Sequence, residues 1–257
     1  RGRLIQENLF DQVIMIYSMN ISFLKAAVDI KRKNNKVKIC LIVPDLPEFM
    51  SDSENPIYRV LKSIEIYFLN KLLKDVDFFV LLTEQMSIKL NVPKNKYTVV
   101  EGIYNNLLVD YNYKKDSNKF VIMYSGTLAK RYGIMNLLSA FSMIIENNFE
   151  LWICGDGDGK TEVIDFANQN RRIKYFGQIN YEDIIKMQKK ADVLVNPRLP
   201  DDEFTQYSFP SKTMEYLASG TPSIAYKLEG IPSEYYPFII FPESNDIESL
   251  HNSILKV

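Results

Sequence analysis

Short β-branched or aromatic runs alternate with longer amphipathic stretches through the second half of the chain, and this alternation constrains the fold most strongly. The runs predicted to be strands cover residues 120–124, 150–154, 173–176, 193–196, 223–226 and 238–241. Helical periodicity lies between them, over residues 134–146, 161–168, 181–189, 211–219 and 246–256. Strands that alternate with helices of this length indicate right-handed βαβ units. The sequence therefore predicts an α/β fold with a parallel, doubly wound sheet.

The first half has the same rhythm in a less complete form. Residues 12–17, 37–43, 76–82 and 97–100 are predicted strands, and residues 21–33 and 57–74 are predicted helices. Residues 104–118, which are polar and rich in Asn, Tyr and Lys, are the expected connection. We therefore expect a partial N-terminal Rossmann-like domain over residues 1–108, with its beginning missing, and a C-terminal Rossmann-like domain over residues 118–257.

Composition excludes several classes of protein. The chain has 31 Lys and Arg against 32 Asp and Glu, a net charge of −1, so binding to nucleic acid through a basic surplus is disfavoured. Cys40 and Cys154 form no CxxC pair, which argues against a disulfide framework and a thiolate zinc site. No apolar run has the length of a membrane-spanning helix, and the first residues do not resemble a signal peptide. We expect a cytoplasmic protein with no metal site.

The segment 207–225, YSFPSKTMEYLASGTPSIA, is the most informative motif. Pro210 suits the first position of a helix, and the amides of Ser211, Lys212 and Thr213 would then point out of the helix N-terminus, which favours an anion. Glu215 follows one turn later and can accept hydrogen bonds from two neighbouring hydroxyl groups. This arrangement suits a nucleoside diphosphate. The alternative is an ordinary helix start with a solvated glutamate.

A second motif, YSGTLAKRYGI over residues 124–134, lies between the first strand and the first helix of the second half. Gly126 permits close backbone approach, and Lys130 and Arg131 can supply the positive charge that a diphosphate lacks. The alternative is that both cations face solvent. The order of strand, glycine, basic residues, glycine and helix favours phosphate binding, with Arg131 preferred because its guanidinium can bind in a bidentate manner.

Residues 207–225 resemble the signature of the retaining glycosyltransferases of family 4, the group 1 glycosyl transferases, which have the GT-B fold of two facing Rossmann-like domains. That signature has two glutamates eight residues apart, followed by small residues and Gly-x-Pro. Glu215 matches the second glutamate, which holds the ribose of the donor in this family. Tyr207 stands at the first position, whose glutamate helps to hold the donor sugar. The resemblance implies that Tyr207 or the acidic run 201–203, with Glu203 as the candidate, contacts the sugar.

The resemblance extends to other loops of the chain. Residues 124–134 are similar to the family's diphosphate loop, and backbone groups near Gln178 and Ile179 would read the edge of the base. Gly155 begins a glycine-rich turn that borders the nucleotide. Asp45, in the loop after the strand 37–43, is the candidate for a role that a histidine has in many relatives, or it is a turn residue. The residues expected to bind the donor are Gly126, Thr127, Gly155, Gln178, Ile179, Glu203, Tyr207, Phe209, Pro210, Ser211, Lys212, Thr213 and Glu215, and those expected to act in catalysis are Arg131, Lys130 and Asp45.

The activity that the resemblance implies is transfer of a sugar from a UDP- or GDP-sugar to a hydroxyl of a glycan or lipid-linked acceptor, with retention at the anomeric carbon. No cofactor or metal is required, because the cations stabilise the leaving diphosphate. The helix 57–74 is basic and amphipathic, which is consistent with contact to the inner face of a membrane. Two alternatives stay open: a non-catalytic nucleotide-sugar-binding subunit, and a nucleotide-sugar epimerase on the same fold. A third, a nicotinamide dehydrogenase, is disfavoured because residues 155–159 have the spacing GxGxG in place of GxGxxG. Donor binding without turnover is also open, because the expected missing segment would supply much of the acceptor site.

Overall fold

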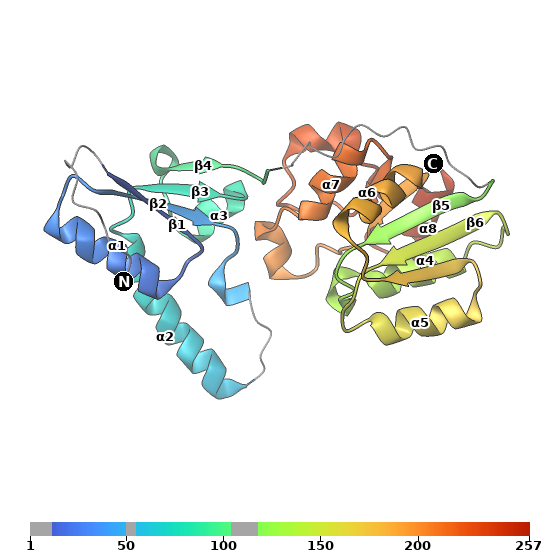
Figure 1. Ribbon diagram of the computed structural model, residues 1–257, viewed down its shortest axis with the longest axis horizontal. Coiled ribbons are helices and arrows are strands. Elements are labelled where there is room, and N and C mark those ends of the chain that lie inside the picture. Colours follow the sequence, from blue (N-terminus) through green and yellow to red (C-terminus); the bar gives the residue numbers. More distant parts are fainter. Residues whose placement is uncertain (1–11, 50–54, 104–117) are drawn as a thin grey trace. The chain divides into compact units, whose positions relative to one another are not determined.

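The computed structural model describes residues 12–49, 55–103 and 118–257 of the chain. The chain divides into two compact units, Arg1–Glu101 and Gly102–Val257, and each contains its own parallel sheet (Figure 1). The predicted α/β fold class is confirmed. The expected connection between the halves lies almost entirely outside the described residues.

The first unit contains a sheet in the order β1-β2-β3-β4, in which all neighbouring strands are parallel. The side chain of Asn20 caps the first helix by accepting hydrogen bonds from the amides of Ser22 and Phe23. The strands are Val13–Tyr17 (β1), Lys38–Val43 (β2), Phe78–Leu81 (β3) and Tyr97–Val99 (β4), and the helices are Ile21–Lys33 (α1), Pro56–Leu73 (α2) and Glu84–Lys89 (α3), with 3-10 turns at Pro47–Phe49 (η1) and Lys94–Lys96 (η2).

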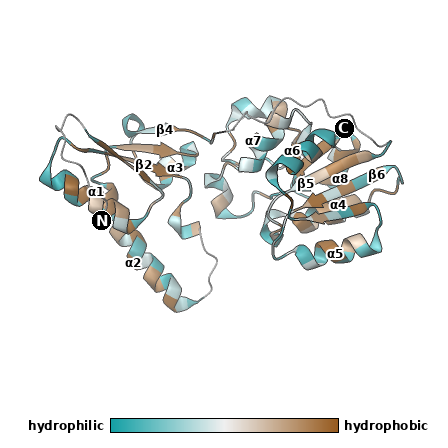
Figure 2. Cartoon of the chain, viewed as in Figure 1, coloured by the Kyte–Doolittle hydropathy of each residue, from teal (hydrophilic) through white to brown (hydrophobic). Residues whose placement is uncertain are grey.

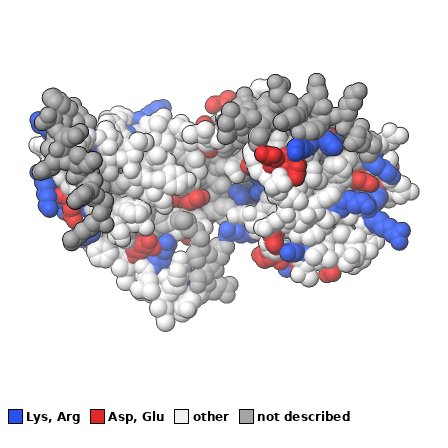
Figure 3. All heavy atoms as spheres, in the orientation of Figure 1, with Lys and Arg blue, Asp and Glu red and all other residues white. Residues whose placement is uncertain are grey.

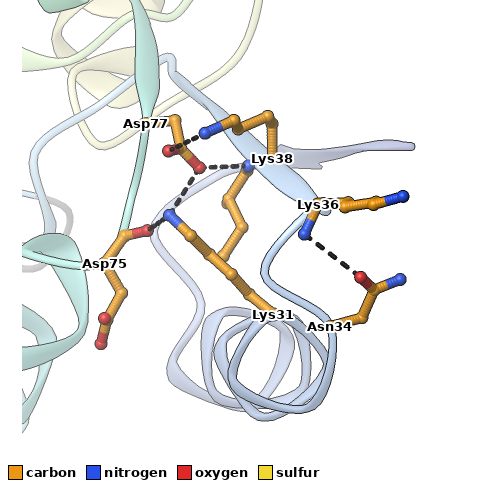
Figure 4. A network of polar contacts seen from close by, with 7 residues as sticks. Lys31, Asn34, Lys36, Lys38, Asp75 and Asp77 are labelled. Carbon is orange, nitrogen blue, oxygen red and sulfur yellow. Dashed lines mark hydrogen bonds and ion pairs between the residues drawn. The ribbon is translucent and has the colours of Figure 1, made fainter. Parts of the chain in front are cut away.

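A polar network joins the end of α1 to β2 and to the residues before β3 (Figure 4). Lys31 Nζ donates to the Asp77 carboxylate at 2.6 Å and to the Asp75 carbonyl at 2.7 Å. The Ile39 amide also donates to Asp77, at 2.9 Å, and Lys38 forms an ion pair with it. Burial acts to raise the pKa of Asp77, but the hydrogen bonds from Lys31 and Ile39 and the two lysine charges outweigh it and lower the pKa. The network fixes three elements of the first unit together.

The second unit contains a parallel sheet in the order β7-β6-β5-β8-β9. The chain runs outward from β5 through β6 to β7 and then returns to form β8 on the other side of β5. The strand order therefore reverses between β5 and β8, which are neighbours. In such sheets the ligand-binding crevice lies at the carboxyl ends of the strands at this switch point. The strands are Phe120–Ser125 (β5), Phe149–Cys154 (β6), Ile173–Gly177 (β7), Val193–Asn196 (β8) and Ser223–Ala225 (β9).

Helices cover both faces of the second sheet, because alternate residues of β5 face opposite sides. Ile122 and Tyr124 pack in a buried cluster with residues of α4, α5 and α8, whereas Val121 and Met123 pack in another with residues of α6 and α7. The central strand β5 is accordingly apolar along most of its length (Figure 2). The helices are Ile134–Ser142 (α4), Lys160–Gln169 (α5), Tyr181–Lys190 (α6), Ser211–Ser219 (α7) and Ile247–Leu255 (α8), with 3-10 turns at Lys130–Tyr132 (η4), Glu203–Tyr207 (η5) and Ser233–Phe238 (η6).

Two predicted elements are wrong in extent. Residues 238–241 form an isolated bridge between Ile240 and Ile224 rather than a strand, because η6 extends to Phe238 and leaves only three residues before Pro242. The helix predicted over 134–146 ends at Ser142. Arg172 donates to the carbonyls of Ile144 and Glu146 at 2.8 and 2.7 Å, so these groups are satisfied without a further helical turn.

Charged side chains of both signs are interspersed on both units on the face that Figure 3 shows. This distribution agrees with the net charge of −1. Among the helices that the structure describes, none combines the length and hydropathy of a membrane-crossing segment.

Candidate nucleotide-sugar site

The loops after β5, β6 and β7 meet at the carboxyl edge of the second sheet. The Gly126 amide donates to the Cys154 carbonyl at 2.9 Å, and the Gly155 amide donates to the Gly177 carbonyl at 2.8 Å. A Cβ on Gly155 would lie 1.8 Å from the Gly126 carbonyl oxygen, so the two loops can approach this closely only without a side chain there. The loops that carry Gly126 and Gly155 are therefore neighbours, as the sequence predicts for adjacent strands.

Lys212, in the first turn of α7, extends across the Gly126 loop. A Cβ on Gly126 would lie 1.8 Å from Lys212 Cε and 2.2 Å from Nζ, and Nζ is 5.7 Å from the centroid of the Tyr124 ring. Burial and the charge of Arg198 lower the pKa of Lys212 to about 8, although the Glu215 carboxylate acts in the opposite direction. A desolvated ammonium beside a second cation is unfavourable by itself, so this position favours an anionic ligand.

Arg198 follows β8 and is the second cation of the site. Its guanidinium carbon lies 4.1 Å from the centroid of the Tyr132 ring and 5.5 Å from that of Phe204. Its Nη1 donates to Ser208 Oγ at 3.0 Å. Arg131 lies over the same two rings, at 5.1 and 5.3 Å, so both guanidinium groups share one pair of aromatic side chains.

The start of α7 differs in detail from the prediction. Pro210 is the N-cap residue, in an extended conformation, and Ser211 is the first helical residue. The Thr213 amide donates to the Pro210 carbonyl at 2.8 Å, so the prediction that three amides point outward holds at most for Ser211 and Lys212. Thr213 is buried, and its Oγ1 has no hydrogen-bond partner among the described residues.

Glu215 lies one turn beyond Lys212 on α7 and is half-buried. Burial raises the pKa of its carboxyl group above the ordinary value. The Lys212 charge and a hydrogen bond from the Gln188 side chain act in the opposite direction but are outweighed. The site thus places the Glu215 carboxylate and the Arg198 guanidinium where both act on Lys212, at the switch point of the sheet. Such a set can bind a diphosphate and accept hydrogen bonds from neighbouring hydroxyl groups.

The structure places other predicted residues beside this cluster or away from it. Lys130 forms an ion pair with Glu162 of α5. Phe209 is 4% exposed and packs in a buried cluster, 5.2 Å from the Tyr235 ring, so its role is in the core. Asp45 is exposed in the turn between β2 and η1 of the first unit.

The remaining predicted residues lie in loops at the carboxyl ends of the strands. Gln178 is exposed and Ile179 half-buried immediately after β7. Glu203 is exposed at the start of η5, and Tyr207 is half-buried at its end. Thr127 is exposed, and its carbonyl accepts a hydrogen bond from the Tyr124 hydroxyl at 2.6 Å.

Arg198 ends the segment 192–198, which resembles the family's fourth strand and the loop behind the donor, but sequence reasoning did not place it among the site residues. The signal that could have found it is a basic residue two positions after a buried parallel strand, at the edge where ligands bind. Its partners Tyr132 and Ser208 come from loops on either side in the sequence, and the stacking that holds it is not visible in any local pattern. Among the described residues, no three His, Cys, Asp or Glu side chains lie where they could hold a metal ion together.

Comparison with solved structures shows a two-unit α/β architecture of the GT-B glycosyltransferase type. Anabaena HepE in complex with UDP superposes with a TM-score of 0.71 at 15% identity, over 94% of this chain and 68% of that one. Sucrose-phosphate synthase from Thermosynechococcus elongatus gives a TM-score of 0.67 at 19% identity, over 95% of this chain and 63% of that one.

The sequence profile of the glycosyl transferases group 1 family matches residues 110–257, and the chain belongs to this family. An uncharacterised glycosyltransferase of Methanocaldococcus jannaschii is 26% identical over 186 residues, which are 64% of this chain and 46% of that protein. The putative colanic acid biosynthesis glycosyl transferase WcaI of Escherichia coli is 28% identical over 142 residues, 52% of this chain and 34% of that protein. The aligned part of the chain thus spans less than half of each of these relatives.

Proposed function

We propose that this chain holds the donor of a glycosyltransferase that moves a sugar from a nucleoside diphosphate sugar to a hydroxyl group. The observation that carries the proposal is the convergence of Lys212, Arg198 and Glu215 beside the Gly126 loop at the switch point of the second sheet. In this proposal the two cations bind the diphosphate and Glu215 accepts hydrogen bonds from the ribose. Family membership supports it, as do the complexes of a structural neighbour with UDP and UDP-glucose.

The other contacts follow from the position of each loop. Backbone groups near Gln178 and Ile179, after β7, would read the base of a UDP- or GDP-sugar. Glu203 or Tyr207, at the two ends of η5, would contact the sugar, because Phe204 in the same turn stacks with Tyr132 beside Arg198. A carboxylate at Glu203 is suited to sugar hydroxyls as long as it stays away from the negative diphosphate.

The proposed reaction retains the configuration at the anomeric carbon and takes a hydroxyl of a glycan or lipid-linked molecule as acceptor. Charge develops on the leaving diphosphate in the transition state, and Arg131, Arg198 and Lys212 would stabilise it. Arg131 is favoured over Lys130 for this role, because the Lys130 ammonium is paired with Glu162. Asp45 stays a candidate from the first unit.

We expect Glu215→Ala to weaken binding of the preferred nucleoside diphosphate by about 1.5–3 kcal/mol, because charged hydrogen bonds to the ribose are lost. Calorimetric titration with UDP, GDP and ADP measures this and identifies the base. Glu146→Ala is the matched control, since Glu146 is exposed in the loop before β6, at the opposite edge of the sheet. Equal affinities of Glu215→Ala and the control would contradict the proposal.

Product analysis separates transfer from the two alternative functions. Incubation of the protein with a radiolabelled nucleotide sugar, with and without acceptor, distinguishes transfer from release of free sugar by an epimerase. Binding without either product is the behaviour of a non-catalytic subunit, which the tyrosine at position 207 would favour.

We also propose that α2 contacts the anionic inner face of a membrane, as a lipid-linked acceptor would require. Large apolar side chains recur every three or four residues along one exposed side of this helix, which Figure 2 shows as brown segments. Arg59, Lys71 and Lys74 are exposed on the same helix or at its end. The exposed apolar residues are Ile57, Val60, Leu61, Ile64, Tyr67 and Phe68.

We expect Ile64→Glu combined with Phe68→Glu to reduce sedimentation with phosphatidylglycerol vesicles by about tenfold, because apolar burial is lost and negative charge is added. The control is Ile145→Glu, on an isoleucine that is 85% exposed in the second unit. Equal sedimentation of both variants, or no sedimentation of the unaltered protein, would contradict membrane contact through α2.

A further inference from the structure

Gln188, on α6, is buried completely and connects both sides of the candidate site. Its Nε2 donates to Ser125 Oγ at 3.0 Å, and its side chain also hydrogen-bonds to the Glu215 carboxylate. Ser125 is the last residue of β5, directly before Gly126. The Gln188 amide therefore joins the residue before the glycine loop to the carboxylate on α7.

The Gln188 side-chain amide donates to two groups, Ser125 and Glu215, while its carbonyl oxygen stays unpaired among the described residues. Its Oε1 is buried and has no hydrogen-bond partner among the described residues. An unpaired buried carbonyl destabilises a fold, and an apolar side chain of the same shape would avoid this. The amide thus supplies hydrogen bonds to Ser125 and Glu215 in an arrangement that stability alone does not favour.

A parallel connection shows that this region sets the position of α7. The Ser125 amide donates to the Tyr216 hydroxyl at 3.1 Å, and Tyr216 is fully buried next to Glu215. On the far side, Thr221 Oγ1 donates to the backbone carbonyl of Gln188 at 2.9 Å. The backbone of Gln188 thus contacts Thr221, whereas its side chain faces Ser125 and the carboxylate.

We infer that Gln188 is a positioning residue that holds the Glu215 carboxylate in place for the donor. This inference rests on the proposed function, because it assigns the purpose of the hydrogen bond to nucleotide binding. The Glu215 carboxylate has one charged neighbour, Lys212, and one neutral hydrogen-bond donor, Gln188, that act on it.

The groups that act on Glu215 are Lys212 of α7 and Gln188 of α6. Lys212 is the charged neighbour, and Arg198 acts on Lys212. The Tyr216 hydroxyl is neutral at physiological pH, because burial raises its pKa to about 12, and burial does the same to the pKa of Cys154, which lies near Tyr216. Lys212 and Gln188 are thus the two groups that oppose the effect of burial on Glu215.

The test is Gln188→Met, which keeps the length of the side chain and removes its donors. The carboxyl carbon of Glu215 is followed by NMR in protein labelled with ¹³C-glutamate, without any ligand, and is assigned through Glu215→Gln. We expect the pKa of Glu215 to rise by about one pH unit in the variant. We expect the thermal midpoint to stay equal or rise, which a merely structural glutamine would not allow.

Calorimetric titration with UDP and GDP then connects this change to binding. We expect Gln188→Met to lose about two- to tenfold in affinity, with a larger loss at pH 6 than at pH 7.5, because a higher pKa leaves less of Glu215 ionised at the lower pH. Thr221→Val is the matched control, since it removes a hydrogen bond to the Gln188 backbone and should leave the pKa of Glu215 unchanged.

Each outcome has a distinct meaning. An unchanged pKa of Glu215 in Gln188→Met, or an equal shift in Thr221→Val, overturns the inference. A shifted pKa with no change in nucleotide affinity at either pH overturns the role in binding, and if Glu215→Ala also binds normally, the proposed function fails with it. Should Gln188→Met not fold, Gln188→Leu is measured in the same way, and a loss of stability in both variants assigns Gln188 a structural role.

Discussion

Lys212 is the residue at which burial, charge and function meet most directly. Its ammonium lies over Gly126 and beside the Tyr124 ring, and burial together with Arg198 lowers its pKa to about 8. A bound diphosphate would replace the missing solvation and stabilise the charged form. The charge of Lys212 therefore changes with pH near 8, close to physiological pH.

We expect the affinity for a nucleoside diphosphate to fall as the pH rises through about 8, the pKa of Lys212. The sign follows from the lowered pKa, since Lys212 is charged below it and neutral above it. Lys212→Met should remove most of this dependence and weaken the diphosphate by about 1.5–3 kcal/mol, with a smaller effect on the nucleoside. Calorimetry between pH 6.5 and about 9.5 measures both effects, with Lys174→Met as an exposed control. A parallel pH profile in Lys212→Met would show that another group titrates.

Single residues also show the limit of sequence reasoning. The spacing of Lys212 and Glu215 within one predicted helix is enough to indicate their proximity, because residues three apart share a helix face. Arg198 gives no such signal, because its position depends on stacking against Tyr132 and Phe204 from two other loops. In the same way, nothing in the sequence around Lys130 shows that its ammonium pairs with Glu162, 32 residues later.

At the scale of elements, periodicity predicted most helices and strands because alternating apolar patterns reflect burial on both faces of a parallel sheet. The helix α3 was missed because six residues are too few for a helical period to stand out. The strand predicted over 238–241 failed because its apolar character serves packing against β9 while η6 interrupts the ladder. Tertiary contacts such as those of Arg172, which end α4 early, have no local signature.

Two glycines at helix ends give a prediction at this scale. Gly133 at the start of α4 and Gly220 at the end of α7 both have left-handed backbones, with φ of 80° and 76°. A Cβ on Gly133 would lie 1.9 Å from the Pro197 carbonyl oxygen, whereas nothing lies within 4 Å of one on Gly220. We expect Gly220→Ala to lower the free energy of unfolding by about 1–2 kcal/mol and Gly133→Ala by more, as measured by urea denaturation. Equal losses would show that the backbone near Pro197 moves without cost.

The whole molecule consists of two units with separate sheets, and this predicts separate responses to perturbation. We expect a saturating nucleoside diphosphate to raise only the thermal transition of the second unit, by several degrees, since ligand at 100 times Kd adds about 2.7 kcal/mol. Asp77→Asn should lower the free energy of unfolding of the first unit alone, by about 1–3 kcal/mol, because Lys31 and the Ile39 amide lose their charged acceptor.

The pH dependence of the Asp77 effect has a defined sign. The pKa of Asp77 is lowered in the folded protein, so its contribution is present above pH 4 or so and disappears as the pH falls through the folded value. Differential scanning calorimetry at pH 7 and pH 3 measures the two transitions. A single transition that moves with both the ligand and the substitution would show that the units unfold together.

The position of β1 has a consequence for handling the protein. Among the described strands it is the outermost of the first sheet, and Val13, Met15 and Tyr17 are more than half exposed along it. An edge strand of this kind offers hydrogen-bonding groups and apolar side chains to any other extended chain. We expect the protein as described to self-associate through added strands at high concentration, and we expect Met15→Lys to reduce this association.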